Sequence, residues 1–319
     1  MKIARHVAGL CALIVAAPLA ADPIDLDTKT IALAPTEPNV NKVGALTYRG
    51  GLELSSKDAR FGGLSGLAVS TDGDRLVTVT DAGHWFEARL VYDTDGTLTG
   101  LADPAMSTLN DESGRPLTSK SESDAESLAP APGGGFLVSF ERQHRAHFYA
   151  APGANAEPPD FALGDLTGVK RNGGLEAMEY LSDGRLLLLT EDHFVADGHL
   201  AGWLVDGGTV VSLTYPGNGF FKPTGLTRLA DGRLLVLERG YTLIGGPKAR
   251  IMMIPPPSGP GAITDLTEIA RLQPPIQVDN YEGIAARTGS NGETLLYIVS
   301  DDNFNGMQRT LLLMFALAE

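Results

Sequence analysis

One module is written five times along this chain, and its period constrains the fold more than any single motif. Each copy begins with a polar, a small and an apolar residue, passes through a glycine-containing turn into an apolar run, and ends that run on an acid. The five starts are Ser65-Gly66-Leu67, Glu126-Ser127-Leu128, Glu176-Ala177-Met178, Thr224-Gly225-Leu226 and Glu282-Gly283-Ile284. The five acids are Asp81, Glu141, Glu191, Glu238 and Asp301. Self-similarity at such a period is typical of solenoids and propellers.

Each copy has the pattern of short antiparallel strands. In the third copy, residues 177–181 and 185–190 are predicted strands joined by Asp183-Gly184, a dipeptide that suits a tight hairpin. Residues 200–205 and 209–215 supply two more strands. Four strands per copy fit a propeller blade. We therefore predict an all-β fold, a β-propeller of four-stranded blades with five readable repeats.

The two ends of the chain are expected to close this ring. The last copy has only three strands, the third at 309–316, whereas residues 44–54 precede the first copy and form an unassigned strand. Pairing these two segments would remove the free edges of the sheet. A sixth blade built from 22–42 and 102–124 stays open, and a generic β-sandwich is the competing fold. The polar 102–124 segment is predicted to be a long exposed loop, with a role as a lid left open.

The first 21 residues have the pattern of a secretory signal. Lys2 and Arg5 precede an apolar stretch at 7–17 that is too short to span a bilayer, and small residues lead up to Asp22. We expect cleavage after residue 21 and a periplasmic or secreted protein. The only cysteine, Cys11, lies in this segment, so the mature chain has no disulfide. Residues 22–42 are predicted to be an extended leader, and 43–319 a single domain.

The charge of the chain limits its partners. The formal net charge is −14, which argues against nucleic acid and anionic membranes as partners. No other stretch is long and apolar enough to span a membrane. A small anionic molecule remains compatible with this charge, because a bound cation reverses the local field. The oligomeric state is left open.

The module predicts where its polar residues meet. Two strands joined by a hairpin are antiparallel, so the start of the first and the end of the second lie at one end of the blade. The first strand of each blade lines the central channel. The five starts and the five acids are therefore expected around one mouth of the channel, with Asp192, Asp302 and Asn303 beside them.

Three glutamates that converge on this axis need a counter-charge to stay ionised. One source is a hard cation such as Ca²⁺, which takes oxygen ligands; the predicted metal ligands are Glu126, Glu176, Glu282 and Asp301. The other source is a network of ion pairs, because Arg142 and Arg239 directly follow two of the acids, and Arg60 and Lys222 precede two of the copies. Both sources are compatible with one site.

Few residues qualify as proton carriers. His193 follows Glu191-Asp192 and is the preferred general base, with Glu191 as the alternative. His84, His144 and His147 have the pattern of exposed loop histidines. The sequence contains no cluster with zinc spacing, no nucleophile elbow and no phosphate-binding loop.

At these residues the chain resembles the bacterial phytase-like β-propeller family, which is described as having esterase-like activity. The matching stretches are Phe61-Gly62-Gly63-Leu64-Ser65-Gly66-Leu67, Asp124-Ala125-Glu126-Ser127-Leu128, Ser139-Phe140-Glu141-Arg142, Pro223-Thr224-Gly225-Leu226, Val236-Leu237-Glu238-Arg239, Tyr281-Glu282-Gly283-Ile284 and Ser300-Asp301-Asp302-Asn303-Phe304. The resemblance implies a propeller whose channel often holds Ca²⁺. The chain departs from a classical phytase in having few lysines, which favours a simpler phosphoester, carboxylic ester or lactone over phytate.

The functional prediction follows from the fold, the acids and the resemblance. We expect an exported, metal-dependent hydrolase of small-molecule esters or phosphoesters. In it Arg142 and Arg239 stabilise the developing anion, and His193 or Glu191 takes the proton. The alternative is a periplasmic propeller without catalytic activity that binds a ligand or a protein partner.

Overall fold

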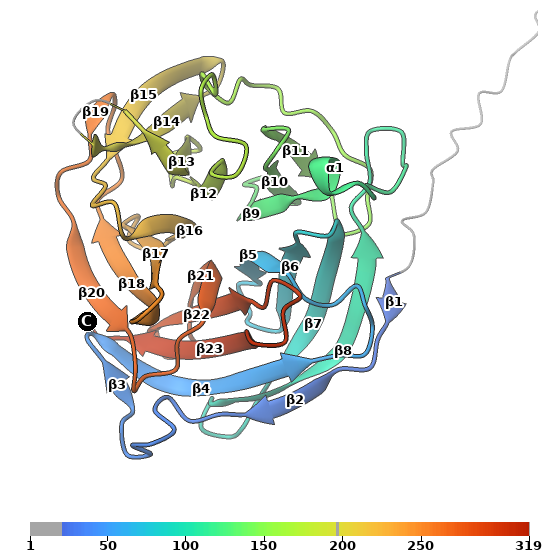
Figure 1. Cartoon of the computed structure of the whole chain (residues 1–319), viewed down its shortest axis with the longest axis vertical. Helices are drawn as coiled ribbons and strands as arrows, with labels where there is room; N and C mark the ends of the chain where they lie inside the picture. Colours follow the sequence, from blue (N-terminus) through green and yellow to red (C-terminus); the bar gives the residue numbers. More distant parts are fainter. Residues whose placement is uncertain (1–20, 196–197, 319) are drawn as a thin grey trace, which may run out of the picture.

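Five small antiparallel sheets lie in a ring in the computed structural model, which describes residues 21–195 and 198–318 (Figure 1). Each sheet is one blade of a five-bladed β-propeller. The predicted signal segment, apart from residue 21, lies outside the described residues. No helix among the described residues has the length and apolar character needed to cross a membrane.

The first three blades follow the first three copies of the module. Blade 1 contains β5 (Leu64–Val69), β6 (Arg75–Thr80), β7 (His84–Tyr92) and β8 (Leu98–Thr108), with β1 (Asp22–Pro23) on its outer edge. Blade 2 contains only β9 (Ala125–Pro130), β10 (Phe136–Phe140) and β11 (Arg145–Tyr149). Blade 3 contains β12 (Leu175–Tyr180), β13 (Leu186–Phe194), β14 (Leu200–Asp206) and β15 (Thr209–Tyr215), with β19 (Gly261–Ala262) beside β15.

The last two blades bring the ends of the chain together. Blade 4 contains β16 (Lys222–Arg228), β17 (Leu234–Thr242), β18 (Gly246–Ile254) and β20 (Thr267–Leu272). Blade 5 contains β21 (Asn280–Thr288), β22 (Thr294–Asp301), β23 (Thr310–Leu317) and β4 (Leu46–Ser55), with β2 (Asp27–Thr30) and β3 (Lys42–Val43) paired to β4. The N-terminal β4 pairs antiparallel with the C-terminal β23, from Thr310 opposite Leu54 to Leu317 opposite Leu46. The predicted closure of the ring is confirmed.

Two segments differ from the sequence prediction. Residues 102–108 are not loop but the second half of β8, the outer strand of blade 1 that pairs with β7. The remainder of the 102–124 segment leads into α1 (Lys120–Ser123), a single helical turn. Residues 22–42 contribute the short edge strands β1, β2 and β3. These segments are polar because edge strands face water on one side. They add to blades 1 and 5 and do not form a sixth blade.

The core lies between neighbouring blades. The leucines at 186–189 in β13 are all at most 1% exposed, as expected for a strand covered on both faces. Between blades 1 and 2, the rings of Trp85 and Tyr149 pack edge to face with their centroids 5.4 Å apart. Burial of apolar surface on both faces of each blade is the main force that holds the ring together.

A β-bulge marks the start of the module in four blades. On the inner strand, Glu126, Glu176, Thr224 and Glu282 are each left without a partner residue, because both of their neighbours pair with consecutive residues of the next strand. In blade 1 the irregularity falls just after Ser65. A bulge bends the strand and redirects a side chain. The polar residue of the module is therefore the extra residue of its strand.

Candidate functional site

Carboxylates from four blades gather at one mouth of the channel. They come from the bulges of the inner strands and from the ends of the second strands: Asp81, Asp124, Glu126, Glu141, Glu176, Glu191, Glu282 and Asp301. We call these eight residues the acid ring. Blade 4 contributes Arg239 in place of an acid. The predicted convergence of the module's polar residues is therefore observed, with the exception of Glu238.

Burial raises the pKa of three glutamates of the acid ring, Glu126, Glu176 and Glu282. Burial, followed by the charges of Glu141 and Asp124, raises the pKa of Glu126 well above its usual range. The same effect raises the pKa of Glu176. The pKa of Glu282 rises to about 8 because of burial, although Arg239 partly opposes the shift. These shifts have the direction expected where carboxylates crowd together away from water.

Arg239 is the cation at the heart of the ring. Its Nε lies 2.8 Å from Oε1 of Glu282, and its Nη2 donates a hydrogen bond of 3.2 Å to Oε1 of Glu191. Burial raises the pKa of Asp301 to about 7, although the hydrogen bond from the backbone of Asn303 and, to a smaller extent, the charge of Arg239 oppose this shift. Arg239 therefore bridges blades 3 and 5, and the ion-pair network predicted from the sequence is present at this position.

A compact group of oxygens lies on the opposite side of the ring. Carboxylate oxygens of Asp124, Glu126 and Glu141 all come within 4.8 Å of one another. An all-oxygen set of this kind suits a hard cation. Of the four predicted metal ligands only Glu126 belongs to this group, and the roles of Glu176, Glu282 and Asp301 in metal binding stay predictions. Asp124 was missed, although it stands two residues before Glu126 in the sequence.

The backbone and two cations orient this group. Oε1 of Glu141 accepts hydrogen bonds from the backbone N–H groups of Gly173 and Gly174, the latter at 2.9 Å. Asp124 pairs with Arg142 through Nε, and its Oδ1 lies 2.6 Å from Nζ of Lys120. The glycines and Arg142 fix two of the three carboxylates, while Glu126 is held by its bulge alone.

Lys120 of α1 joins two blades across the mouth. Its Nζ lies 2.6 Å from Oδ2 of Asp81 as well as from Asp124. The other oxygen of Asp81, Oδ1, is buried and has no hydrogen-bond partner among the described residues. Burial raises the pKa of Asp81, and the bond from Lys120 opposes this shift. Lys120 could not be recognised from the sequence, because it lies in an irregular segment that the repeat does not predict.

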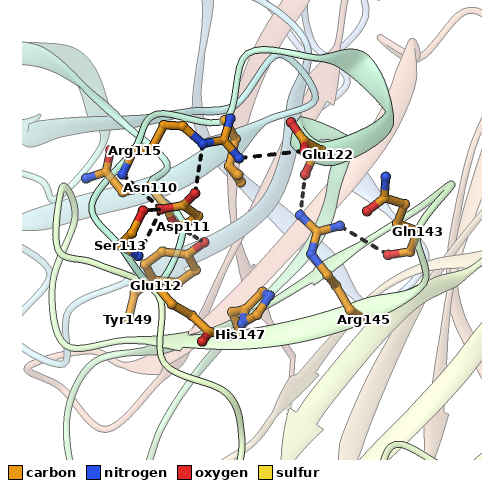
Figure 2. Close-up of a pocket in the computed structure, with 11 residues that line it drawn as sticks. Asn110, Asp111, Glu112, Ser113, Arg115, Glu122, Gln143, Arg145, His147 and Tyr149 are labelled. Atoms are coloured by element: carbon orange, nitrogen blue, oxygen red, sulfur yellow. Dashed lines mark hydrogen bonds and ion pairs between the residues drawn. The ribbon is translucent and has the colours of Figure 1, made fainter.

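The residues around a pocket outside the acid ring hold α1 in place. Figure 2 shows this pocket, of about 310 Å³, with Arg145 between α1 and the start of β11. The guanidinium of Arg145 donates to the backbone oxygens of Glu122 and Gln143, and it stacks 4.0 Å from the ring centre of Phe140. Burial lowers the pKa of Arg145. Arg145 thereby anchors the turn that carries Lys120.

Glu238 does not join the acid ring, which corrects the sequence prediction. Its side chain is buried inside blade 4, where Oε1 accepts a 2.7 Å hydrogen bond from the Tyr215 hydroxyl and Oε2 pairs with Nε of Arg250. Two partners, one on β15 of blade 3 and one on the neighbouring β18, thus turn this acid away from the channel. The matching start residue, Thr224, donates its hydroxyl hydrogen to the backbone oxygen of Tyr281 at 2.9 Å.

Other predicted residues lie around the ring. His193 is near the end of β13. Its ring lies close to Gly168, since a Cβ atom added to that glycine would be 3.7 Å from Cε1 of His193. Asp192 pairs with Lys170 and Lys222, at 2.7 and 3.2 Å. Arg60 is away from the ring and forms ion pairs with Asp58 and Asp22. Oδ1 of Asp302 accepts hydrogen bonds from the backbone N–H groups of Gly63 and Phe304. His84 and His147 are half-buried rather than exposed, and burial lowers the pKa of both.

A cleft adjoins the ring at Arg239. Its volume is about 540 Å³, and it lies between the β17–β18 hairpin and the loop from β22 to β23. Asn280, on its wall, is 3.5 Å from Oδ2 of Asp301, and the backbone N–H of Asn303 donates to Oδ1 of the same aspartate at 2.6 Å. A small molecule in this cleft would therefore reach the acid ring.

The comparisons with known proteins bear on both fold and family. The family model described as "Phytase-like: Esterase-like activity of phytase" matches residues 59–304. The chain belongs to the phytase-like family. This match covers all five copies of the module, so the phytase-like propeller and the repeat coincide. Among curated proteins, none matches the chain.

One solved structure shares the architecture of this phytase-like chain at low sequence identity, and a second is similar at a lower TM-score. An α-L-arabinofuranosidase from Podospora anserina, in complex with cellotriose, is 11% identical with a TM-score of 0.51, over 87% of this chain and 98% of that one. The catalytic domain of an α-L-arabinofuranosidase from Coprinopsis cinerea is 12% identical with a TM-score of 0.49, over 88% of this chain and 100% of that one. Likeness at this level of identity concerns the fold.

Proposed function

We propose that this phytase-like protein is an exported, metal-dependent hydrolase of esters or phosphoesters, with its site at the acid ring. The observation that carries the proposal is the charge balance of the ring. Eight carboxylates face three cationic side chains, Lys120, Arg142 and Arg239. Four of these carboxylates, Glu126, Glu141, Glu176 and Asp301, have no ion-pair partner among the described residues. A divalent cation would supply positive charge to them. The family's description as esterase-like supports ester hydrolysis.

The group that would hold the cation is Asp124, Glu126 and Glu141, since its oxygens are already close together. Ca²⁺ is the proposed ion because every ligand is a hard oxygen. When bound, such an ion polarises a carbonyl or phosphoryl oxygen and increases the acidity of water. The remaining predicted ligands, Glu176, Glu282 and Asp301, would complete the surroundings of the ion and the substrate.

The arginines and Glu191 supply the rest of the chemistry. Arg239 lies between the ring and the cleft, where its guanidinium would stabilise negative charge that develops on the substrate. Arg142 is placed to do the same on the opposite side, beside Asp124. Glu191, which accepts a hydrogen bond from Arg239, is the proposed base, and His193 is the alternative base.

The test compares Glu126→Gln with Glu112→Gln in the mature protein. Glu126 is held in the ring, whereas Glu112 is exposed and lies outside it. Calcium content would be measured by mass spectrometry, and hydrolysis followed with p-nitrophenyl butyrate and p-nitrophenyl phosphate, with and without EGTA. We expect Glu126→Gln to lose the metal and at least tenfold of the rate, and Glu112→Gln to retain both. Retention of metal and rate by Glu126→Gln would refute the assignment.

A propeller that binds a ligand without turning it over is the second candidate. The observation in its favour is that Lys120, Arg142 and Arg239 form ion pairs with acids of the ring. It predicts no hydrolysis of either ester by a correctly folded protein, with or without Ca²⁺. Export is tested separately: N-terminal sequencing of protein recovered from the periplasm or medium should begin at Asp22.

A further inference from the structure

The cleft beside the acid ring has the size and position of a substrate pocket. Its volume of about 540 Å³ falls within the usual range for small-molecule sites, roughly 300–1,000 Å³. It begins at Arg239 and extends outward between two loops, so a molecule bound there would place one end against the ring. The polar side chains that line it include Tyr241, Lys248, Asn280, Asn303, Asn305 and Gln308.

Four carboxamides line this cleft, and each has one half of its side chain uncommitted. Asn280 and Asn303 use their side-chain N–H groups, toward Asp301 at 3.5 Å and toward Gln308 at 3.2 Å. Asn305 and Gln308 use their oxygens, which accept from the backbone of Met307 at 3.2 Å and from Asn303. Two amide oxygens and two amide NH₂ groups therefore have no partner among the described residues.

This mixture of free donors and acceptors distinguishes between kinds of ligand. A hydroxyl group both donates and accepts, so it satisfies either half of a carboxamide. An ionised phosphate only accepts, and would leave the two free amide oxygens facing its negative oxygens. An acyl chain would desolvate all four amides without replacing their hydrogen bonds.

Two of the three charged residues that line the cleft are already paired with residues outside its wall. Arg239 is paired with Glu282 at 2.8 Å, and Asp279 lies 3.3 Å from Nε of Arg309. Lys248 adds a single positive charge. A wall with this balance suits a neutral polar molecule better than a polyanion.

Tyr241 adds an aromatic surface to the wall. Its side chain is 62% exposed although it lies on the cleft, so the ring has little protein packed against it. A flat apolar face beside free amides matches a sugar ring, which has C–H groups on its faces and hydroxyls on its edge. Burial of both surfaces by one ligand would explain why they are placed together.

We propose that this cleft binds a neutral sugar unit, and that the substrate is an ester carried on that sugar, with the bond to be broken at the acid ring. This assignment rests on the proposed hydrolase function and names its substrate class. Tyr241 would stack on the sugar ring, while Asn280, Asn303, Asn305 and Gln308 would bond its hydroxyls.

Binding is tested without any hydrolysis. Saturation-transfer NMR would use the methyl glycosides of glucose, galactose, xylose and arabinose with the metal-supplemented protein and with Tyr241→Ala, Asn305→Ala and Leu243→Ala. Leu243 is the matched control, because it lies in the same hairpin, is 92% exposed and does not line the cleft. We expect transfer to at least one glycoside, at least tenfold weaker binding in the first two variants, and no change in the control. Absence of binding to all four sugars would overturn the proposal.

Selectivity is tested in a second assay that separates this proposal from the proposed function. The ratio of kcat/KM on a 6-O-acetylated methyl glycoside to kcat/KM on p-nitrophenyl acetate should fall at least tenfold in Tyr241→Ala. An equal loss on both esters would show that the cleft holds any leaving group, and would overturn the sugar assignment while leaving the hydrolase intact. Sugar binding without hydrolysis of either ester would refute the proposed hydrolase function and leave the assignment of the cleft as a sugar site intact.

Discussion

Glu179 offers a quantitative test of how burial in the inner strands affects stability. It lies on β12, three residues beyond Glu176, and its side chain is only 8% exposed. Burial raises its pKa from 4.5 to about 7, although the charge of Arg228 opposes the shift. The folded state therefore holds this proton more tightly than the unfolded chain does.

The sign of the effect follows from this difference. Between about pH 4.5 and 7 the folded protein carries the proton and the unfolded chain does not, so the free energy of unfolding falls as the pH rises. A shift of 2.5 units from 4.5 to about 7 corresponds to about 3 kcal/mol, at 1.36 kcal/mol per unit. The contribution is fully lost above about pH 7.

Glu179→Gln removes the titration but keeps the size of the side chain. Urea unfolding at pH 4.5 and pH 8 gives the free energy of unfolding of each protein, and the variant minus the wild type is the quantity of interest. We expect this difference to increase by about 3 kcal/mol from pH 4.5 to pH 8. The same comparison with Glu112→Gln, at an exposed position, should show no increase. A difference for Glu179→Gln that is equal at the two pH values would refute the reasoning.

Three further substitutions test other contacts. Arg250→Met should reduce the free energy of unfolding by about 3–5 kcal/mol, because it leaves the fully buried Glu238 without its cation. Chemical denaturation measures this free energy, and a loss below about 1 kcal/mol would contradict the prediction. Gly283→Ala should cost about 1–3 kcal/mol, since the new methyl would lie 2.9 Å from the backbone of Gly66 on the inner strand of the neighbouring blade 1. An unchanged melting temperature would argue against such close packing. Lys120→Met should increase Ca²⁺ affinity at least tenfold in a calorimetric titration, because it removes a competing positive charge; weaker binding would mean that the lysine organises the site.

Much of the fold follows from the repeat in the sequence. The spacing of the modules and their hairpin turns predicted the blades, and the missing strand of the last copy predicted the pairing of β4 with β23. The mouth of the channel was located from the antiparallel geometry of each hairpin and from the place of each first strand along the channel. These features are local or periodic, so a single sequence carries enough information to find them.

Contacts between distant segments were not accessible in the same way. Glu238 looked equivalent to the other acids, but Tyr215 of blade 3 and Arg250 on the neighbouring β18 bind it. Lys120 reaches Asp81 from a segment with no periodic pattern. The strand at 102–108 was missed because a polar outer strand, solvated on one face, resembles a loop.

The bulges at the starts of the modules have a consequence for how such a protein changes over time. Four of the residues at these starts have no pairing partner on the second strand of their blade: Glu126, Glu176, Thr224 and Glu282. A substitution at such a position leaves the pairing of the first strand with the second strand in place. Chemistry at the axis is thus uncoupled from the assembly of each blade. Serine, threonine or glutamate can therefore replace one another at these positions one at a time. The activity of the site can change in this way while the blades keep their structure.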